Sequence, residues 1–140
     1  MNFLLDTNVV SEWVKPRPNA GMVKWLAEAD EDRIFLSVVT LGELQYGVER
    51  LAPGERRKRL EEWLEAELKD RFEERVVGVD EEIAVTWGKL LAKLDRTGRP
   101  MGVADGFLAA TAMARGMALV TRNVEDFLAV DVELVNPWNE

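Results

Sequence analysis

The sequence contains no histidine and no cysteine among its 140 residues. Without histidine there is no Ser-His-Asp triad, no histidine-bound zinc and no imidazole general base. Without cysteine, thiol nucleophiles, cysteine-ligated zinc, iron–sulfur clusters and disulfides are excluded as well. Any catalysis by this chain must therefore use carboxylates, hydroxyls, amines or a cofactor.

Positive charge is also scarce. The 18 Lys and Arg residues stand against 26 Asp and Glu residues, which gives a formal net charge of −8. A domain that coats nucleic acid usually carries the opposite sign, because Lys and Arg neutralise phosphates. The acidic balance still permits an enzyme whose acidic pocket holds metal ions that in turn contact phosphates.

Long hydrophobic runs are missing too. No apolar run reaches the roughly 18 residues that a membrane-spanning helix needs. The first residues, 1–6, contain no basic segment and reach an acid too soon for a signal peptide, so we expect a cytoplasmic protein. The composition, 47% hydrophobic and 31% charged, is typical of a globular chain, and no repeat or linker divides it. We therefore expect one domain over residues 1–140.

Short apolar runs alternate along the chain with amphipathic segments. The runs predict buried strands, and apolar side chains at three- and four-residue steps predict helices. The predicted strands cover 3–5, 34–39, 76–79, 117–120 and 132–135, and the predicted helices cover 9–14, 20–29, 41–51, 55–72, 81–94, 103–114 and 124–128. This alternation indicates a three-layer α/β/α domain with a mostly parallel central sheet flanked by helices.

Ligands bind such sheets beyond the carboxyl ends of the strands, so acids at these ends are candidate site residues. Asp6 directly follows the first strand, where it is equally suited to cap the next helix. Glu43 follows the second strand, and its structural alternative is a capping-box bond with Thr40. Asp105 enters a mostly apolar helix. Its burial there is costly unless it is paired or bound to a metal, and its structural alternative is a first-turn acid that favours the helix dipole.

More oxygen donors follow the strand 117–120, namely Thr121, Asn123 and Asp126. A cluster of oxygen donors without histidine or cysteine suits Mg²⁺ or Mn²⁺, hard cations that keep several waters and bind phosphates. Such ions generate a bound hydroxide and stabilise a leaving oxygen. Hydrolysis of a phosphodiester is therefore the chemistry that these residues favour.

Four segments resemble the motifs of PIN domains, in particular the VapC-type toxins of bacterial type II toxin–antitoxin systems. They are LLDTNVVSE at 4–12, LSVVTLGELQYG at 36–47, ADGFLAATA at 104–112 and LVTRNVEDF at 119–127. The tail Asn136-Pro137-Trp138 is similar to that of the FitB-like branch. The segments occur in the family's order and with family-like spacing, from about residue 2 to the C-terminus.

The resemblance implies a PIN-like fold and a toxin that cuts RNA as an Mg²⁺- or Mn²⁺-dependent endoribonuclease. Asp6, Glu43 and Asp105 match the family's metal ligands, and Asn123 stands where a fourth acid is common. We predict these four as the catalytic residues and the first three as metal ligands, with one firmly held ion because Asn123 lacks a charge. Supporting roles are predicted for Thr7, Asn8 and Thr121, which orient carboxylates or metal-bound water, for Arg122, which contacts phosphate, and for Asp126.

The resemblance also implies partners. They are an RNA substrate (tRNA, rRNA or mRNA), a second copy in a homodimer, and a small cognate antitoxin of the VapB/FitA-like kind that masks the acidic pocket. A larger assembly with antitoxin on DNA is a further option, and no membrane is involved. The basic run 56–59 is interpreted as a solvated helix face with i,i+4 ion pairs. Trp25, Trp63 and Trp87 are predicted in the core or a dimer interface rather than as base-stacking platforms.

Three alternative functions follow from the same residues. A haloacid-dehalogenase-like phosphatase would use Asp6 as nucleophile, but Asn8 stands where its second Asp is needed, and a receiver domain lacks its acidic pair. The main alternative is a FitB-like interaction module with weak or no nuclease activity, acting in a DNA-bound repressor complex with its antitoxin. Asn123 favours this module, whereas the intact Asp6, Glu43 and Asp105 oppose it. Metal-dependent cleavage separates the two.

Overall fold

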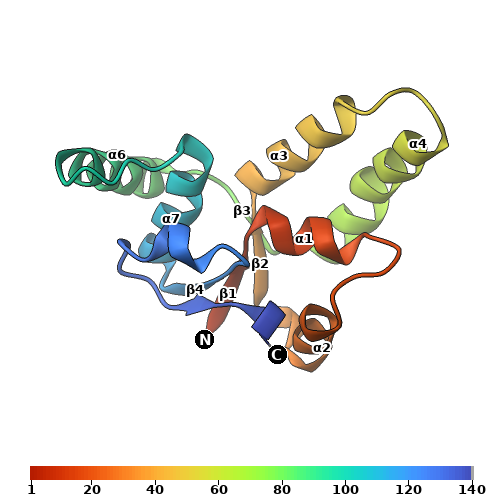
Figure 1. The fold of residues 1–140 in the computed structure, drawn as a ribbon, viewed down its shortest axis with the longest axis horizontal. Coiled ribbons are helices and arrows are strands. Elements are labelled where there is room, and N and C mark those ends of the chain that lie inside the picture. The colour runs from red at the N-terminus through yellow and green to blue at the C-terminus, as the bar shows by residue number, and fades with distance from the viewer. Residues whose placement is uncertain (140) are drawn as a thin grey trace.

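The computed structural model describes residues 1–139, and over these residues five parallel strands form one sheet (Figure 1). The strands are β1 (Asn2–Leu5), β2 (Ile34–Ser37), β3 (Val76–Val77), β4 (Met117–Val120) and β5 (Leu134–Val135). Their order across the sheet is β3-β2-β1-β4-β5, so β1 is central. Because every neighbouring pair is parallel, all carboxyl ends lie along one edge.

Helices cover both faces of this sheet. They are α1 (Thr7–Trp13), α2 (Ala20–Glu28), α3 (Val38–Glu49), α4 (Glu55–Glu62), α5 (Lys69–Arg71), α6 (Glu81–Arg96) and α7 (Val103–Arg115). Single 3-10 turns span Glu31–Arg33, Val124–Phe127 and Pro137–Asn139. In Figure 1, α6 and α7 lie on one side of the sheet, and α1, α3 and α4 lie on the other.

The hydrophobic core lies on both sides of β1. Leu5 is fully buried in a cluster with Val9 of α1 and Leu36 of β2. Its neighbour Leu4 is fully buried in a second cluster, with Leu108 of α7. Successive side chains of a strand point to opposite faces, so these two residues connect the two layers of helices to one sheet. The predicted three-layer α/β/α fold is therefore confirmed, and the sheet is parallel throughout its described strands.

Several element boundaries differ from the predicted ones. The second strand ends at Ser37 instead of residue 39, because the Ser37 hydroxyl caps α3 by accepting a 3.0 Å hydrogen bond from Val39 N. The predicted strands 76–79 and 132–135 shrink to two residues each. The predicted helix 55–72 is present, but a π-helical turn (Trp63–Leu68) joins α4 to α5. Within residues 1–139, no helix is long and apolar enough to cross a membrane.

Candidate active site

Asp6 is held where two neighbouring strands end. It directly follows β1, and Thr121 directly follows the adjacent β4. The Thr121 hydroxyl donates a 2.7 Å hydrogen bond to Asp6 Oδ2, and the Asp6 backbone N–H donates to Val120 O at 2.8 Å. Because both bonds are made at the end of a paired strand, the sheet itself fixes this carboxylate, which is only 5% exposed.

The Asp6 side chain is also the N-cap of α1, which is the structural role that the sequence suggested for it as an alternative. Asp6 Oδ1 accepts a 2.7 Å bond from Thr7 N, and Oδ2 accepts a 3.3 Å bond from Asn8 Nδ2. Burial raises the pKa of Asp6 above its ordinary value; the bonds from Thr121 and Thr7 oppose this shift, and the nearby carboxylates of Glu43 and Asp126 add to it. Capping α1 and belonging to an acidic cluster are therefore compatible roles.

Glu43 is directed toward α1 and away from its own helix end. Thr7 Oγ1 donates a 2.6 Å hydrogen bond to Glu43 Oε1 and lies 3.3 Å from Thr40 Oγ1. The predicted capping box between Thr40 and Glu43 is wrong, because Ser37 caps α3 and Thr40 is buried inside the helix. Thr7 therefore connects the two candidate acids: its backbone N–H donates to Asp6 and its hydroxyl donates to Glu43.

Asp105 lies in the first turn of α7, on the opposite side of the sheet from α3. Burial raises its pKa to about 6, and the carboxylates of Asp6, Asp126 and Glu43 add to the shift. A first-turn position by itself favours the charged form of an acid. Here burial and like charge outweigh that preference, as expected for a carboxylate that belongs to an acidic cluster.

These three acids line one open cavity of about 390 Å³ at the carboxyl edge of the sheet. The predicted residues Thr7, Asn8, Arg122 and Asn123 line it as well. Thr121 lies behind Asp6 and is fully buried, which suits the predicted supporting role. The exposed Asp126 is not among the lining residues. Its negative charge nevertheless contributes to raising the pKa of Asp6 and of Asp105.

Four further residues line the cavity without having been predicted from the sequence: Ser11, Glu12, Lys15 and Trp138. Glu12 is 9% exposed and accepts 2.8 Å bonds from Lys15 Nζ and Asn19 N, which lower its pKa. The signal for Glu12 was available, because it follows Asn8 by four residues and so shares its face of α1. Trp138 gave no comparable signal, since its place at the cavity depends on tertiary packing.

The donor set of this cavity fits a hard divalent cation. Within residues 1–139, no three acidic side chains are close enough to one another to ligate one ion directly. Water molecules would therefore complete the coordination, as Mg²⁺ commonly requires, and the cavity is wide enough to hold them. The raised pKa values of Asp6 and Asp105 result in part from repulsion between carboxylates, which a bound cation would relieve.

The family of this chain follows from its similarity to known proteins. Residues 3–133 match the PIN domain. The chain belongs to the PIN-domain family. The resemblance inferred from the four sequence motifs is thereby confirmed, and PIN-domain nucleases of the VapC type are generally dependent on a divalent metal.

Relatives of this PIN domain cover almost its whole length. Toxin FitB of Neisseria gonorrhoeae is 36% identical over 137 residues, covering 98% of this chain and 99% of the relative. The tRNA(fMet)-specific endonuclease VapC of Shigella flexneri is 30% identical over 139 residues, covering 99% of each chain. The crystal structure of FitAcB from Neisseria gonorrhoeae contains a chain with a TM-score of 0.92 and 36% identity, covering 99% of both chains. The PIN domain is thus similar in sequence and in shape to toxins and ribonucleases.

Proposed function

We propose that this PIN domain is the toxin of a type II toxin–antitoxin pair and that it hydrolyses RNA phosphodiester bonds with the help of Mg²⁺ or Mn²⁺. The observation that carries the proposal is the convergence of Asp6, Glu43 and Asp105 on one cavity. These acids come from the end of β1, from α3 and from α7, three separate parts of the fold. Relatives named as a toxin and as ribonucleases support the same chemistry.

In this proposal Asp6, Glu43 and Asp105 hold the metal ion, directly or through water. When bound, the ion supplies an activated water and stabilises charge on the phosphate. The residues around the acids set their orientation: Thr121 and Asn8 hold Asp6, and Thr7 holds Glu43. Hydrogen bonds of this kind fix ligand geometry before the metal binds, which raises affinity and selectivity.

Asn123 serves in this scheme as a neutral oxygen donor at the cavity. Its backbone N–H donates a 3.0 Å bond to Thr121 Oγ1, so Asn123 is connected to Asp6 through a single hydroxyl. Asn123 adds no charge, and the carboxylate of Glu12 is already paired with Lys15, so the cavity suits one firmly bound cation. Asp126 contributes negative potential to the same site.

A small cognate antitoxin of the VapB/FitA-like kind is the proposed inhibitor. A second cavity of about 820 Å³ adjoins the acidic one and shares Thr7, Ser11, Lys15 and Glu43 with it. Its other walls are largely apolar, formed by α1, α3, α4 and the π-helical turn, and Trp63 is among them. A peptide segment lying in this cavity would reach the acidic site directly, which supports inhibition by masking.

Residues of the basic run 56–59 lie in two environments, an ion-paired helix face and the wall of the second cavity. Arg57 pairs with Glu61 and Glu49, both at 2.7 Å, in agreement with the predicted i,i+4 pairing on the helix face. Arg56 and Arg59 line the second cavity. Their positive charge at this cavity favours an antitoxin segment with carboxylates near them.

A homodimer that acts in the cytoplasm completes the proposal. Val38 and Tyr46, 40% and 64% exposed, lie eight residues apart on α3 and therefore share one side of that helix. An exposed apolar side of this kind suits contact with a second copy. Trp25, in contrast, packs in the core edge to face with Phe3, and Trp87 stacks on Phe107 at 4.6 Å.

The test is cleavage of total cellular RNA by the purified, antitoxin-free protein with Mg²⁺, Mn²⁺ or EDTA. Discrete fragments that require metal are expected, and Asp6→Ala should abolish them. Asp70→Ala, which removes an exposed carboxylate on α5, is the matched control and should cleave normally. A folded protein that cleaves nothing with either metal would favour the second candidate, an interaction module on DNA, for which Asn123 is the favouring observation.

A further inference from the structure

Arg122 lines the acidic cavity, yet its guanidinium has no carboxylate within ion-pair distance in the described chain. The hydrogen bonds of Arg122 are made by its backbone: its N–H donates to Asn8 Oδ1 at 3.2 Å, and its carbonyl accepts from Asn136 Nδ2 at 3.4 Å. Lys15, the other cation that lines the cavity, is instead paired with Glu12 at 2.8 Å. Over residues 1–139, the Arg122 guanidinium thus has no hydrogen-bond or ion-pair partner, and four carboxylates line the same cavity.

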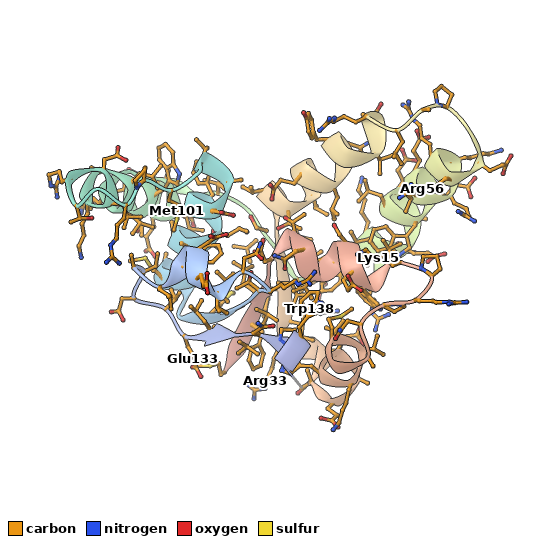
Figure 2. The ribbon with its side chains drawn as sticks, viewed as in Figure 1. Lys15, Arg33, Arg56, Met101, Glu133 and Trp138 are labelled. Atoms are coloured by element: carbon orange, nitrogen blue, oxygen red, sulfur yellow. The ribbon has the colours of Figure 1, made fainter. Side chains whose placement is uncertain are left out.

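The Trp138 ring holds this guanidinium in place. Arg122 Cζ lies 5.5 Å from the ring centroid, a cation–π distance. Trp138 lines the same cavity, and Figure 2 draws it beside α1. Its backbone N–H donates a 3.0 Å bond to Asn136 Oδ1, and its ring packs against the core cluster that contains Leu5 and Val9. The aromatic platform under Arg122 is therefore part of the fold.

We propose that Arg122, positioned by Trp138, binds a backbone phosphate of the RNA substrate. This inference rests on the proposed ribonuclease function. A guanidinium that contacts an aromatic ring through its face keeps its N–H donors in the plane, where they match two phosphate oxygens. The cavity needs such a group, because Asp6, Glu12, Glu43 and Asp105 all repel a polyanion.

A purely structural role for Arg122 makes a different prediction. Its charge contributes to lowering the pKa of Glu12, so Arg122 also offsets part of the negative potential. If that were its whole role, its removal would change stability in EDTA and would leave the salt dependence of RNA binding unaltered. Binding of one phosphate, in contrast, contributes about 0.7 to the slope of log affinity against log salt for a single strand.

The experiment compares Arg122→Ala, Arg122→Lys, Trp138→Leu and Trp138→Phe with the wild type. One measurement is kcat and KM with Mn²⁺ on an RNA that the wild type cleaves. The other is binding of a fluorescein-labelled, random-sequence single-stranded RNA in Ca²⁺ over a series of salt concentrations. Arg33→Ala is the matched control, because Arg33 precedes β2 at the opposite edge of the sheet and pairs with Asp30.

Arg122→Ala should raise KM about tenfold with a smaller change in kcat, and it should reduce the salt slope by about 0.7. Arg122→Lys should keep the slope and recover part of the affinity, because its ammonium cannot bind two phosphate oxygens in the same fork. Trp138→Leu should raise KM several-fold and keep the slope, since the charge remains. Trp138→Phe should restore most of the loss, and Arg33→Ala should behave as the wild type.

The outcomes separate this inference from the proposed function. If the wild type cleaves RNA but Arg122→Ala keeps its KM and salt slope, the phosphate site is wrong and the nuclease stands. If no protein cleaves RNA but Arg122→Ala alone shows the salt slope reduced by about 0.7, the phosphate site stands and the nuclease is wrong. An unchanged KM in a folded Trp138→Leu overturns the positioning role of Trp138. Arg122 is exposed, so Arg122→Ala should fold with a melting temperature close to that of the wild type.

Discussion

Thr121 Oγ1 and Asp6 Oδ2 are joined by a buried 2.7 Å hydrogen bond, although the two residues are 115 positions apart in sequence. The bond connects the ends of the adjacent strands β4 and β1. It lowers the pKa of Asp6 against the effect of burial, so it favours the charged carboxylate that a metal ion requires. The supporting residues of this site can therefore be tested separately from the acids themselves.

Thr121→Val should weaken Mn²⁺ binding about 10- to 100-fold, because Asp6 loses the bond that orients it and its pKa rises further. Isothermal titration calorimetry at neutral pH measures the affinity. Thr111→Val is the matched control: Thr111 is also a buried threonine, but its hydroxyl donates to Phe107 O within α7. Equal Mn²⁺ affinities for the two variants would contradict a role for Thr121 in the site.

Asp105 should make the metal-free protein less stable as the pH rises. Its folded pKa of about 6 exceeds the ordinary value of 3.8, so the folded state binds the proton more tightly than the unfolded state. The stabilising contribution of this proton is full below about pH 4 and is lost as the pH rises to about 6. The measurement is the melting temperature in EDTA over this range.

Asp105→Asn removes this titration. The difference in melting temperature between Asp105→Asn and the wild type should therefore grow in favour of the variant from about pH 4 to about pH 6 and then level off. Glu125→Gln, which also removes one carboxylate but outside the cavity lining, serves as the control for the loss of a negative charge. A constant difference between Asp105→Asn and the wild type would show that the Asp105 carboxyl does not titrate differently in the folded state.

Gly106→Ala should destabilise the protein by about 1–3 kcal/mol. An added Cβ at Gly106 would lie 2.5 Å from Leu91 Cδ1 and 2.9 Å from Trp87 Nε1, so these side chains of α6 would have to shift. Gly88→Ala on α6 is the matched control; its Cβ meets nothing within 4 Å, and it should stabilise the helix by about 0.5–1 kcal/mol. Urea unfolding measures both changes. If both variants have the same stability, the close packing at Gly106 has no energetic consequence.

Asn123→Asp should tighten Mn²⁺ binding about tenfold, because a charged ligand replaces a neutral one beside the same ion. In EDTA the same variant should melt at a lower temperature than the wild type, since the added carboxylate repels Asp6 and Asp105. Calorimetry and thermal melting measure the two effects. Asn2→Asp, at the opposite end of β1, adds the same charge away from the cavity and should leave Mn²⁺ affinity unchanged. If Asn123→Asp leaves Mn²⁺ affinity as unchanged as Asn2→Asp does, residue 123 lies outside the metal environment.

Sequence patterns did not predict the boundary between β2 and α3, because two positions suit it equally well. Ser37 and Thr40 are both good N-caps, and Val38 and Val39 suit the end of a strand as well as they suit the first turn of a helix. Only the pairing of Ser37 with Val77 of β3, where the sheet ends, shows that the strand stops and α3 begins there. The capping-box interpretation of Glu43 failed with it, because the partner of Glu43 lies on α1.

Local sequence patterns are sufficient to predict the layered α/β architecture, because hydrophobic periodicity and turn residues act over a few neighbours. Composition also restricts the chemistry of the candidate site, since a chain without histidine or cysteine offers a hard cation only oxygen. The tertiary structure decided which side chains meet. Thr121 reaches Asp6, and Trp138 lies under Arg122, because β4 and β5 follow β1 in the sheet order. That order is set by packing between distant segments, which no local pattern records.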